Sequence, residues 1–191
     1  MSTEKLEKKK KNRFIRVMVV IVLLLAVIGT VSYFGAKRVF PLKHETVISQ
    51  NAERFGVDKY LVMALIRTES NYRESVVSHA NAIGLMQITD ETGEFIARNL
   101  GYADYDISML YNAEINIEFG TWYISWLIEK FDNNLDNALA SYNAGFNKVN
   151  SWLSDEKYSS DGVTLTNIPY QETKNFVSRV NTYRSIYKVM Y

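Results

Sequence analysis

Cysteine is absent from this 191-residue chain, and proline occurs only twice, at positions 41 and 169. Without cysteine, disulfide bonds, thiolate nucleophiles and cysteine-ligated metal sites are excluded, so the folded part depends on its core for stability. The two prolines and nine glycines leave long stretches without helix breakers. Because no convincing alternating strand pattern lies between them, we expect a mainly α protein.

Histidine is almost as scarce, since His44 and His79 are the only two and lie 35 residues apart. They form no H-x-x-x-H spacing, so the sequence offers no zinc site. The glycines form no G-x-x-x-x-G-K phosphate loop, and no G-x-S-x-G nucleophile motif occurs. We therefore expect neither a metal ion nor an organic cofactor.

Positive charge is concentrated at the start of the chain. Residues 1–16 hold seven of the 22 basic residues and two acids, whereas residues 37–191 carry a net charge of −4. Between them, residues 17–36 form an uncharged apolar run, which as a helix spans about 30 Å and matches the hydrocarbon core of a bilayer. The run is longer than the apolar part of a cleaved signal peptide, which is the alternative interpretation.

This distribution predicts a single-pass membrane protein. The basic residues at 1–16 favour a cytoplasmic N-terminus, a membrane anchor at 17–36, a linker at 37–43 and an extracytoplasmic domain at 44–191. Membrane topology and anionic lipids explain the basic run, so we expect no nucleic-acid partner.

Helical periodicity covers most of the exported part. Helices are expected at 44–55 ending at Gly56, from an Asp58 N-cap to about residue 70, at 90–99, 112–131, 135–142 and 146–153, and from Pro169 onward. The 112–131 segment is the expected central core helix, with an inner stripe at Ile115, Phe119, Trp122, Tyr123, Trp126 and Leu127.

The helix that begins after Asp58 ends in an acid on its apolar face. Seven residues at about 100° each bring Glu69 to within about 20° of Val62, beside Leu65 and Ile66. Burial and the negative end of the helix dipole both oppose ionisation there, which suits a general acid for glycosidic cleavage. The alternative is a structural acid paired with Arg67, Arg73 or Arg98.

Short motifs follow one another along the exported part: T-E-S at 68–70, Ser78, G-L-M-Q at 84–87, S-Y-N-A-G at 141–145 and I-P-Y-Q-E-T at 168–173. Their order and spacing resemble the soluble lytic transglycosylase domain, a family related to goose-type lysozyme. The resemblance covers about residues 45–190 and implies a lysozyme-like, mostly helical fold. It also implies cleavage of the β-1,4 bond between N-acetylmuramic acid and N-acetylglucosamine in peptidoglycan, with formation of 1,6-anhydromuramoyl ends.

The resemblance assigns roles to the matching residues. Glu69 corresponds to the single catalytic carboxyl group, which acts first as an acid and then as the base that activates the muramoyl 6-hydroxyl. The substrate-binding residues implied are Ser78, Gln87, Tyr142, Asn143 and Glu172. Each also has a structural alternative. Ser78 could cap a loop, Gln87 could bond to the backbone, and Tyr142 could pack in the core. Asn143 could be a turn residue, and Glu172 could be an acid that favours the first turn of a helix.

The sequence departs from the family pattern at two places. After G-L-M-Q the family usually has an apolar residue, Met and Pro, whereas this chain has Ile88-Thr89-Asp90 and lacks the substrate-facing thioether. After Y-N-A-G the family commonly has Pro-Gly, where this chain has Phe146-Asn147. We expect the first change to alter sugar contacts and the second to affect only a helix start.

Two other functions stay open at this point. A goose-type lysozyme would use the same glutamate to hydrolyse the glycan, and a non-catalytic module would only bind the cell wall. In all three cases the partners are peptidoglycan strands and, through residues 17–36, a membrane.

Overall fold

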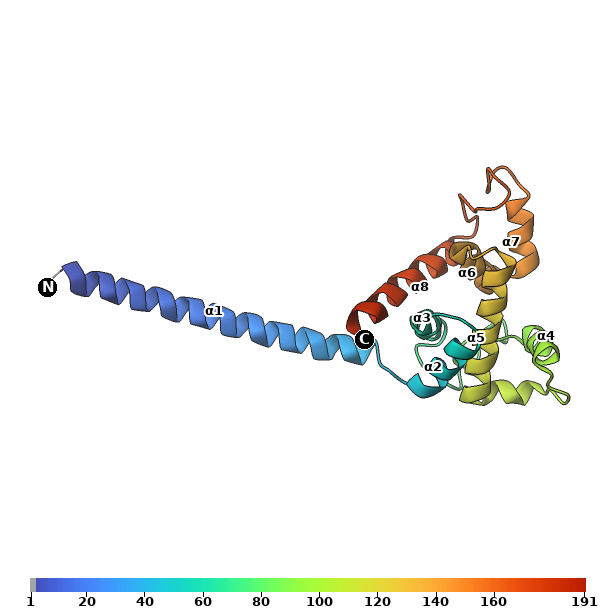
Figure 1. Cartoon of the computed structure of the whole chain (residues 1–191), viewed down its shortest axis with the longest axis horizontal. Helices are drawn as coiled ribbons and strands as arrows, with labels where there is room; N and C mark the ends of the chain where they lie inside the picture. The colour runs from blue at the N-terminus through green and yellow to red at the C-terminus, as the bar shows by residue number, and fades with distance from the viewer. Residues whose placement is uncertain (1–2) are drawn as a thin grey trace. The chain divides into compact units, whose positions relative to one another are not determined.

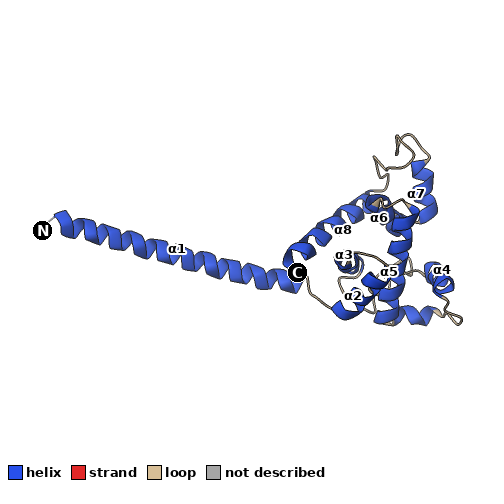
Figure 2. Ribbon diagram, in the orientation of Figure 1, coloured by secondary structure: helices blue, strands red, loops and turns tan. Residues whose placement is uncertain are grey.

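The computed structural model describes the backbone of residues 3–191 and the side chains of residues 8–191. The first part of the expected basic segment therefore lies outside the described side chains. The helices are α1 (Thr3–Val39), α2 (Glu45–Arg54), α3 (Lys59–Glu69), α4 (Asp90–Leu100), the 3₁₀ helix η1 (Ile107–Tyr111), α5 (Ala113–Lys130), α6 (Leu135–Ala144), α7 (Phe146–Leu153) and α8 (Gln171–Met190) (Figure 1). No strand is drawn in the described chain (Figure 2), which confirms the mainly α class.

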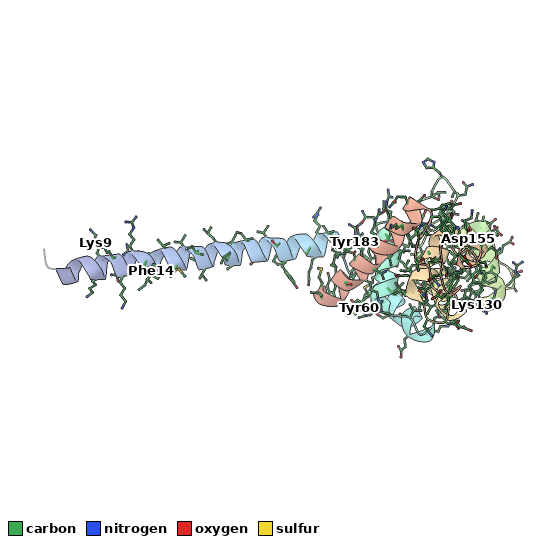
Figure 3. The ribbon with its side chains drawn as sticks, turned by 90° about the horizontal axis from the view of Figure 1, so that it is seen from above. Lys9, Phe14, Tyr60, Lys130, Asp155 and Tyr183 are labelled. Carbon is green, nitrogen blue, oxygen red and sulfur yellow. The ribbon has the colours of Figure 1, made fainter. Side chains whose placement is uncertain are left out.

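The chain divides into two compact units, one up to Leu42 and one covering Lys43–Tyr191. In the first unit, Lys8–Val39 is long and apolar enough to cross a membrane, with a mean hydropathy of 2.8 in its apolar window. Side chains such as Lys9 and Phe14 extend outward from α1 without packing against one another (Figure 3). The helix therefore has no buried face of its own.

Helix α1 continues beyond the expected end of the apolar run. It includes part of the expected linker, because the helix ends at Val39 and the Phe40 N–H still donates to the Ala36 carbonyl at 2.8 Å. Lys37 and Arg38 lie in its last turn, where their charges complement the helix dipole.

Helix boundaries in the second unit follow local signals with one exception. Asp58 caps α3 by accepting a hydrogen bond from the Tyr60 N–H, and Gly101 ends α4 in a left-handed conformation with φ 80°. The expectation that Pro169 opens the last helix is wrong. Helix α8 begins at Gln171, because its N-cap Tyr170 is still extended, with φ −88° and ψ 118°.

Helix α5 is the central packing element of this unit. It contacts α2, α4 and α6, and α3 packs against α8 (Figure 1). Its buried face includes Ile117, Phe119, Ile124 and Leu127. The expected stripe is therefore only partly correct, because the ring-bearing residues between Phe119 and Leu127 stay partly exposed.

Candidate active site

A cavity of about 560 Å³ lies where α3, the loop after it, α5, α6 and the start of α8 come together. All six residues predicted from the sequence line it: Glu69, Ser78, Gln87, Tyr142, Asn143 and Glu172. The fold thus collects residues that are up to 103 positions apart in the chain.

Glu69 is the last residue of α3 and is partly exposed to this cavity. Burial raises the pKa of its carboxyl group to about 8, and the negative charge of Glu172 contributes in the same direction. Among residues 8–191 it forms no ion pair with an arginine. Arg67 instead bonds to Asn71, and Arg73 donates to a backbone carbonyl at 3.0 Å. The arginine-paired alternative is therefore wrong.

Helix α3 is fixed to α8 at the end opposite Glu69. The Asp58 carboxylate accepts hydrogen bonds from Arg184 at 2.7 Å and from Lys188 at 2.9 Å. Burial raises the pKa of Asp58, but the bonds from these two cations and from the Tyr60 N–H together outweigh it, so the pKa lies below its ordinary value. The same side chain thus caps α3 and pairs it with α8, which carries Glu172 near its start.

The G-L-M-Q loop is held by an asparagine that the sequence analysis missed. Asn116 is fully buried in α5, accepts the Met86 N–H at 2.8 Å, and donates to the carbonyls of Ile83 at 3.0 Å and Leu110 at 2.9 Å. Gly84 has φ 81°, and a Cβ there would lie 2.4 Å from the Asn116 side chain. A polar residue on the buried face of a central helix was the available signal.

Hydrogen bonds within the protein decide which polar atoms are left for a ligand. Gln87 uses both N–H groups of its amide on the carbonyls of Val76 and Gly84, at 3.1 and 2.9 Å, which leaves its side-chain oxygen as an acceptor. Asn143 accepts from Thr173 at 2.7 Å, which leaves its NH₂ group as a donor. One acceptor and one donor in a single cavity match the N–H and C=O of an acetamido group.

Two further predicted residues are anchored in similar ways. The Ser78 hydroxyl accepts the Ala82 N–H at 3.1 Å, so its proton remains free to donate. Tyr142 donates its hydroxyl proton to the Met86 carbonyl at 2.8 Å. Burial raises the pKa of Tyr142, and the nearby Glu69 charge adds to this, so the phenol stays neutral.

The cavity lining includes residues that the sequence analysis did not select: His79, Thr89, Thr92, Tyr123, Ala144 and Gly145. Tyr123 was expected in the core, but its ring lies 5.5 Å from that of Tyr142 and forms part of the cavity wall. Among residues 8–191 no three acidic or histidine side chains are grouped closely enough to hold a metal ion. The arrangement combines a buried carboxyl group of raised pKa, a second acid at Glu172, and the hydrogen-bonding groups of Ser78, Gln87, Tyr142 and Asn143.

Comparison with known proteins identifies this arrangement. The family model described as the transglycosylase SLT domain matches residues 46–165. The chain belongs to the SLT family. A soluble lytic murein transglycosylase of Salmonella typhimurium is 32% identical over 151 residues, and the match covers 78% of this chain but 23% of that protein. The SLT chain thus spans less than a quarter of that relative's length.

A membrane-bound relative and two solved structures are also similar. The membrane-bound lytic murein transglycosylase C of Cronobacter sakazakii is 28% identical, with 76% of this chain and 46% of that protein covered. The 70-kDa soluble lytic transglycosylase in complex with bulgecin A superposes with a TM-score of 0.72 at 27% identity, covering 81% of this chain and 25% of that chain. An inactive mutant of the Pseudomonas aeruginosa lytic transglycosylase Slt gives 0.69 at 28% identity, covering 78% and 24%. These matches confirm the lysozyme-like fold of the SLT domain.

Proposed function

We propose that this SLT protein is a peptidoglycan lytic transglycosylase that cleaves the β-1,4 bond between N-acetylmuramic acid and N-acetylglucosamine and leaves 1,6-anhydromuramoyl ends. The observation that carries the proposal is the position of Glu69, a buried carboxyl group with a pKa of about 8 in a cavity that also contains the hydrogen-bonding groups of Ser78, Gln87 and Asn143. Relatives named lytic murein transglycosylase support the same activity.

In the first step, the protonated Glu69 donates its proton to the glycosidic oxygen as the bond to the anomeric carbon breaks. The resulting cation needs stabilisation, and the substrate's own acetamido oxygen supplies it when the group is held in place. The Asn143 amide donor and the Gln87 acceptor suit that task, because they complement the acetamido C=O and N–H.

In the second step, the ionised Glu69 takes the proton from the muramoyl 6-hydroxyl, whose oxygen closes on the anomeric carbon. Glu69 is then protonated again, and no water is consumed. An internal hydroxyl has a large proximity advantage over bulk water. A carboxyl group whose pKa is near neutrality serves well in both roles, because neither protonation state is strongly favoured.

We further propose that α1 anchors the protein with its N-terminus in the cytoplasm and its SLT domain outside the cell. The apolar window of α1 and the membrane-bound relative support anchoring. The orientation follows from the basic residues that precede the apolar run. In this proposal residues 17–36 are the span and 44–191 the catalytic domain.

The test is Glu69→Gln in the full-length protein. The amide has the shape of the carboxyl group but can neither donate the acid proton nor act as the base. We expect release of muropeptides from purified peptidoglycan to fall by at least about a thousandfold, the combined contribution of acid and base catalysis. Activity within tenfold of wild type would reject Glu69 as the catalytic residue.

Thermal unfolding supplies the control for folding. With a folded-state pKa of about 8 against an ordinary 4.5, Glu69 ionises first in the unfolded chain, so wild-type stability falls as the pH rises from about 4.5 towards 8. Glutamine does not titrate. We therefore expect Glu69→Gln to be more stable than wild type at pH 7 by about 3 kcal/mol, and to lose this advantage at pH 4.

A hydrolytic, goose-type lysozyme activity is the second candidate, because Glu172 provides a second carboxyl group close enough to raise the pKa of Glu69. Mass spectrometry of the released muropeptides separates the two reactions. Anhydro ends support transglycosylation, whereas reducing ends that are heavier by one water support hydrolysis. Binding to peptidoglycan without any released product would instead indicate a wall-binding module.

A further inference from the structure

A second cavity of about 490 Å³ continues from the catalytic one. The two share Thr92, Tyr123, Ala144 and Gly145, so they are parts of one cleft. Beyond these shared residues the second cavity extends between α4, α5 and the start of α7. None of the residues assigned from the sequence lines this extension.

Its wall is a connected series of aromatic rings that starts in the catalytic cavity. The Tyr142 ring lies 5.5 Å from that of Tyr123, which stacks at 6.0 Å on Trp126. Trp126 in turn contacts Phe95 and Phe146, each at 5.1 Å. These rings stay partly exposed, which explains why Tyr123 and Trp126 are not buried in the core as the helical periodicity predicted. Phe146 stands where the family commonly has proline, so a departure that was expected to affect only a helix start also contributes to this wall.

Charge changes sign along the cleft. The titratable acids of the catalytic cavity are Glu69 and Glu172, whereas the far cavity carries the exposed cations Arg98 and Lys148. The one acid in the far cavity, Glu91, lies next to the shared Thr92 and is close enough to raise the pKa of Tyr123. Arg98 lies seven residues further along α4, about 10 Å away.

Both cations are available to a ligand. The Arg98 side chain forms no hydrogen bond or ion pair within residues 8–191. Lys148 contacts only a neutral partner there, the Tyr170 hydroxyl at 3.2 Å and its ring at 5.2 Å. A ligand that carries carboxylates could form ion pairs with both side chains.

We propose that the second cavity binds the anionic peptide stem of the glycan strand whose sugars occupy the catalytic cavity. The sugars of the strand are neutral and need no cation, whereas the stem that leaves muramic acid carries carboxylates and alanine methyl groups. The carboxylates complement Arg98 and Lys148, and the methyl groups complement the Trp126 and Phe146 rings. The negative charge of Glu172 in the catalytic cavity repels the same carboxylates, so the stem is favoured in the second cavity rather than in the catalytic one. This inference rests on the proposed function.

The experiment compares two substrates with full-length protein in detergent: glycan strands that carry their stems, and the same strands after an amidase has removed the stems. For each protein, the measured quantity is kcat/KM on stem-bearing strands divided by kcat/KM on stripped strands. We expect the double variant Arg98→Gln/Lys148→Gln to lower this ratio by about fivefold, which is the size of effect that the loss of two exposed ion pairs produces. The control Lys157→Gln/Arg179→Gln makes the same change in charge at exposed positions outside both cavities, and should leave the ratio unchanged.

The alternatives give different results. An equal fall in kcat/KM on both substrates would assign the cations to the glycan, either to its sugars or to the lactyl carboxylates that the amidase leaves on it. Unchanged kcat/KM values on both substrates would deny the cations a role. Either result overturns the inference. Wild-type protein that releases nothing from either substrate refutes the proposed function instead. Calorimetric titration with a synthetic stem tripeptide then decides the inference alone. Binding that weakens about fivefold in the double variant supports it, and no binding to wild type overturns it.

Discussion

Glu69 and Glu172 reach the catalytic cavity from the end of one helix and the beginning of another. Burial is the larger cause of the raised Glu69 pKa, and the Glu172 charge is the smaller one. Glu172 lies in the first turn of α8, where an acidic side chain complements the positive end of the helix dipole. One carboxylate thus helps the other to keep its proton.

This coupling predicts the pH dependence of the proposed activity. The proposed reaction requires the acid form of Glu69, so kcat/KM should fall as the pH rises through about 8. Glu172→Gln removes a neighbouring negative charge, which makes ionisation of Glu69 easier and should move this alkaline limb to lower pH. Measured pH profiles check the shift. Glu129→Gln, an exposed acid outside both cavities, serves as the control, and a limb that stays in place in Glu172→Gln would contradict the coupling.

Thr173 is buried behind Asn143 and fixes which end of that amide faces the cavity. We predict that Thr173→Val, which keeps the shape but removes the hydroxyl group, lowers kcat about tenfold, because the amide loses its orienting partner. Thr173→Ser keeps the hydroxyl group and should recover most of the rate. Steady-state kinetics of both variants provides the measurement, and equal rates in valine and serine variants would assign Thr173 to packing alone.

At the scale of elements, the sequence predicts helices better than it predicts what their faces contact. Asp58 and Gly101 mark helix ends correctly because caps depend on nearby residues. The Trp126 ring was assigned to the core because helical periodicity identifies an apolar face, but periodicity does not say whether protein or a cleft lies against it. Asn116 was missed for a related reason, since its three partners are on other segments.

The contacts of Asn116 make α5 a support for the active-site loop, and this predicts a stability effect. Asn116→Ala leaves the buried Met86 N–H and the Leu110 carbonyl without a partner, whereas the Ile83 carbonyl still accepts the Ile88 N–H, so we expect the free energy of unfolding to fall by about 3 kcal/mol. Urea unfolding followed by tryptophan fluorescence measures this, because all three tryptophans lie in the SLT domain. Asn112→Ala removes only the N-cap of the same helix and should cost about 1 kcal/mol. Equal losses would contradict the support role.

At the scale of the whole molecule, two units with different physical requirements share one chain. The unit up to Leu42 contains a helix whose stretch 17–36 is apolar on all sides, whereas Lys43–Tyr191 has a buried core of its own. Length, hydropathy and charge define the first unit in the sequence. The second requires contacts between segments distant in sequence, which is why short motifs, rather than composition, indicated its active site.

The proposed topology can be tested on a background without thiols, since the chain has no cysteine. Asn12→Cys lies in the basic part of α1, and Ser160→Cys lies in an exposed loop of the SLT domain. We predict that a membrane-impermeant maleimide added to intact spheroplasts labels Ser160→Cys, whereas Asn12→Cys reacts only after the membrane is permeabilised, because the basic residues hold the N-terminus inside. Wild-type protein should stay unlabelled. The opposite pattern would reverse the orientation, and Ser160→Cys protein released by carbonate washing would indicate that the apolar helix is not an anchor.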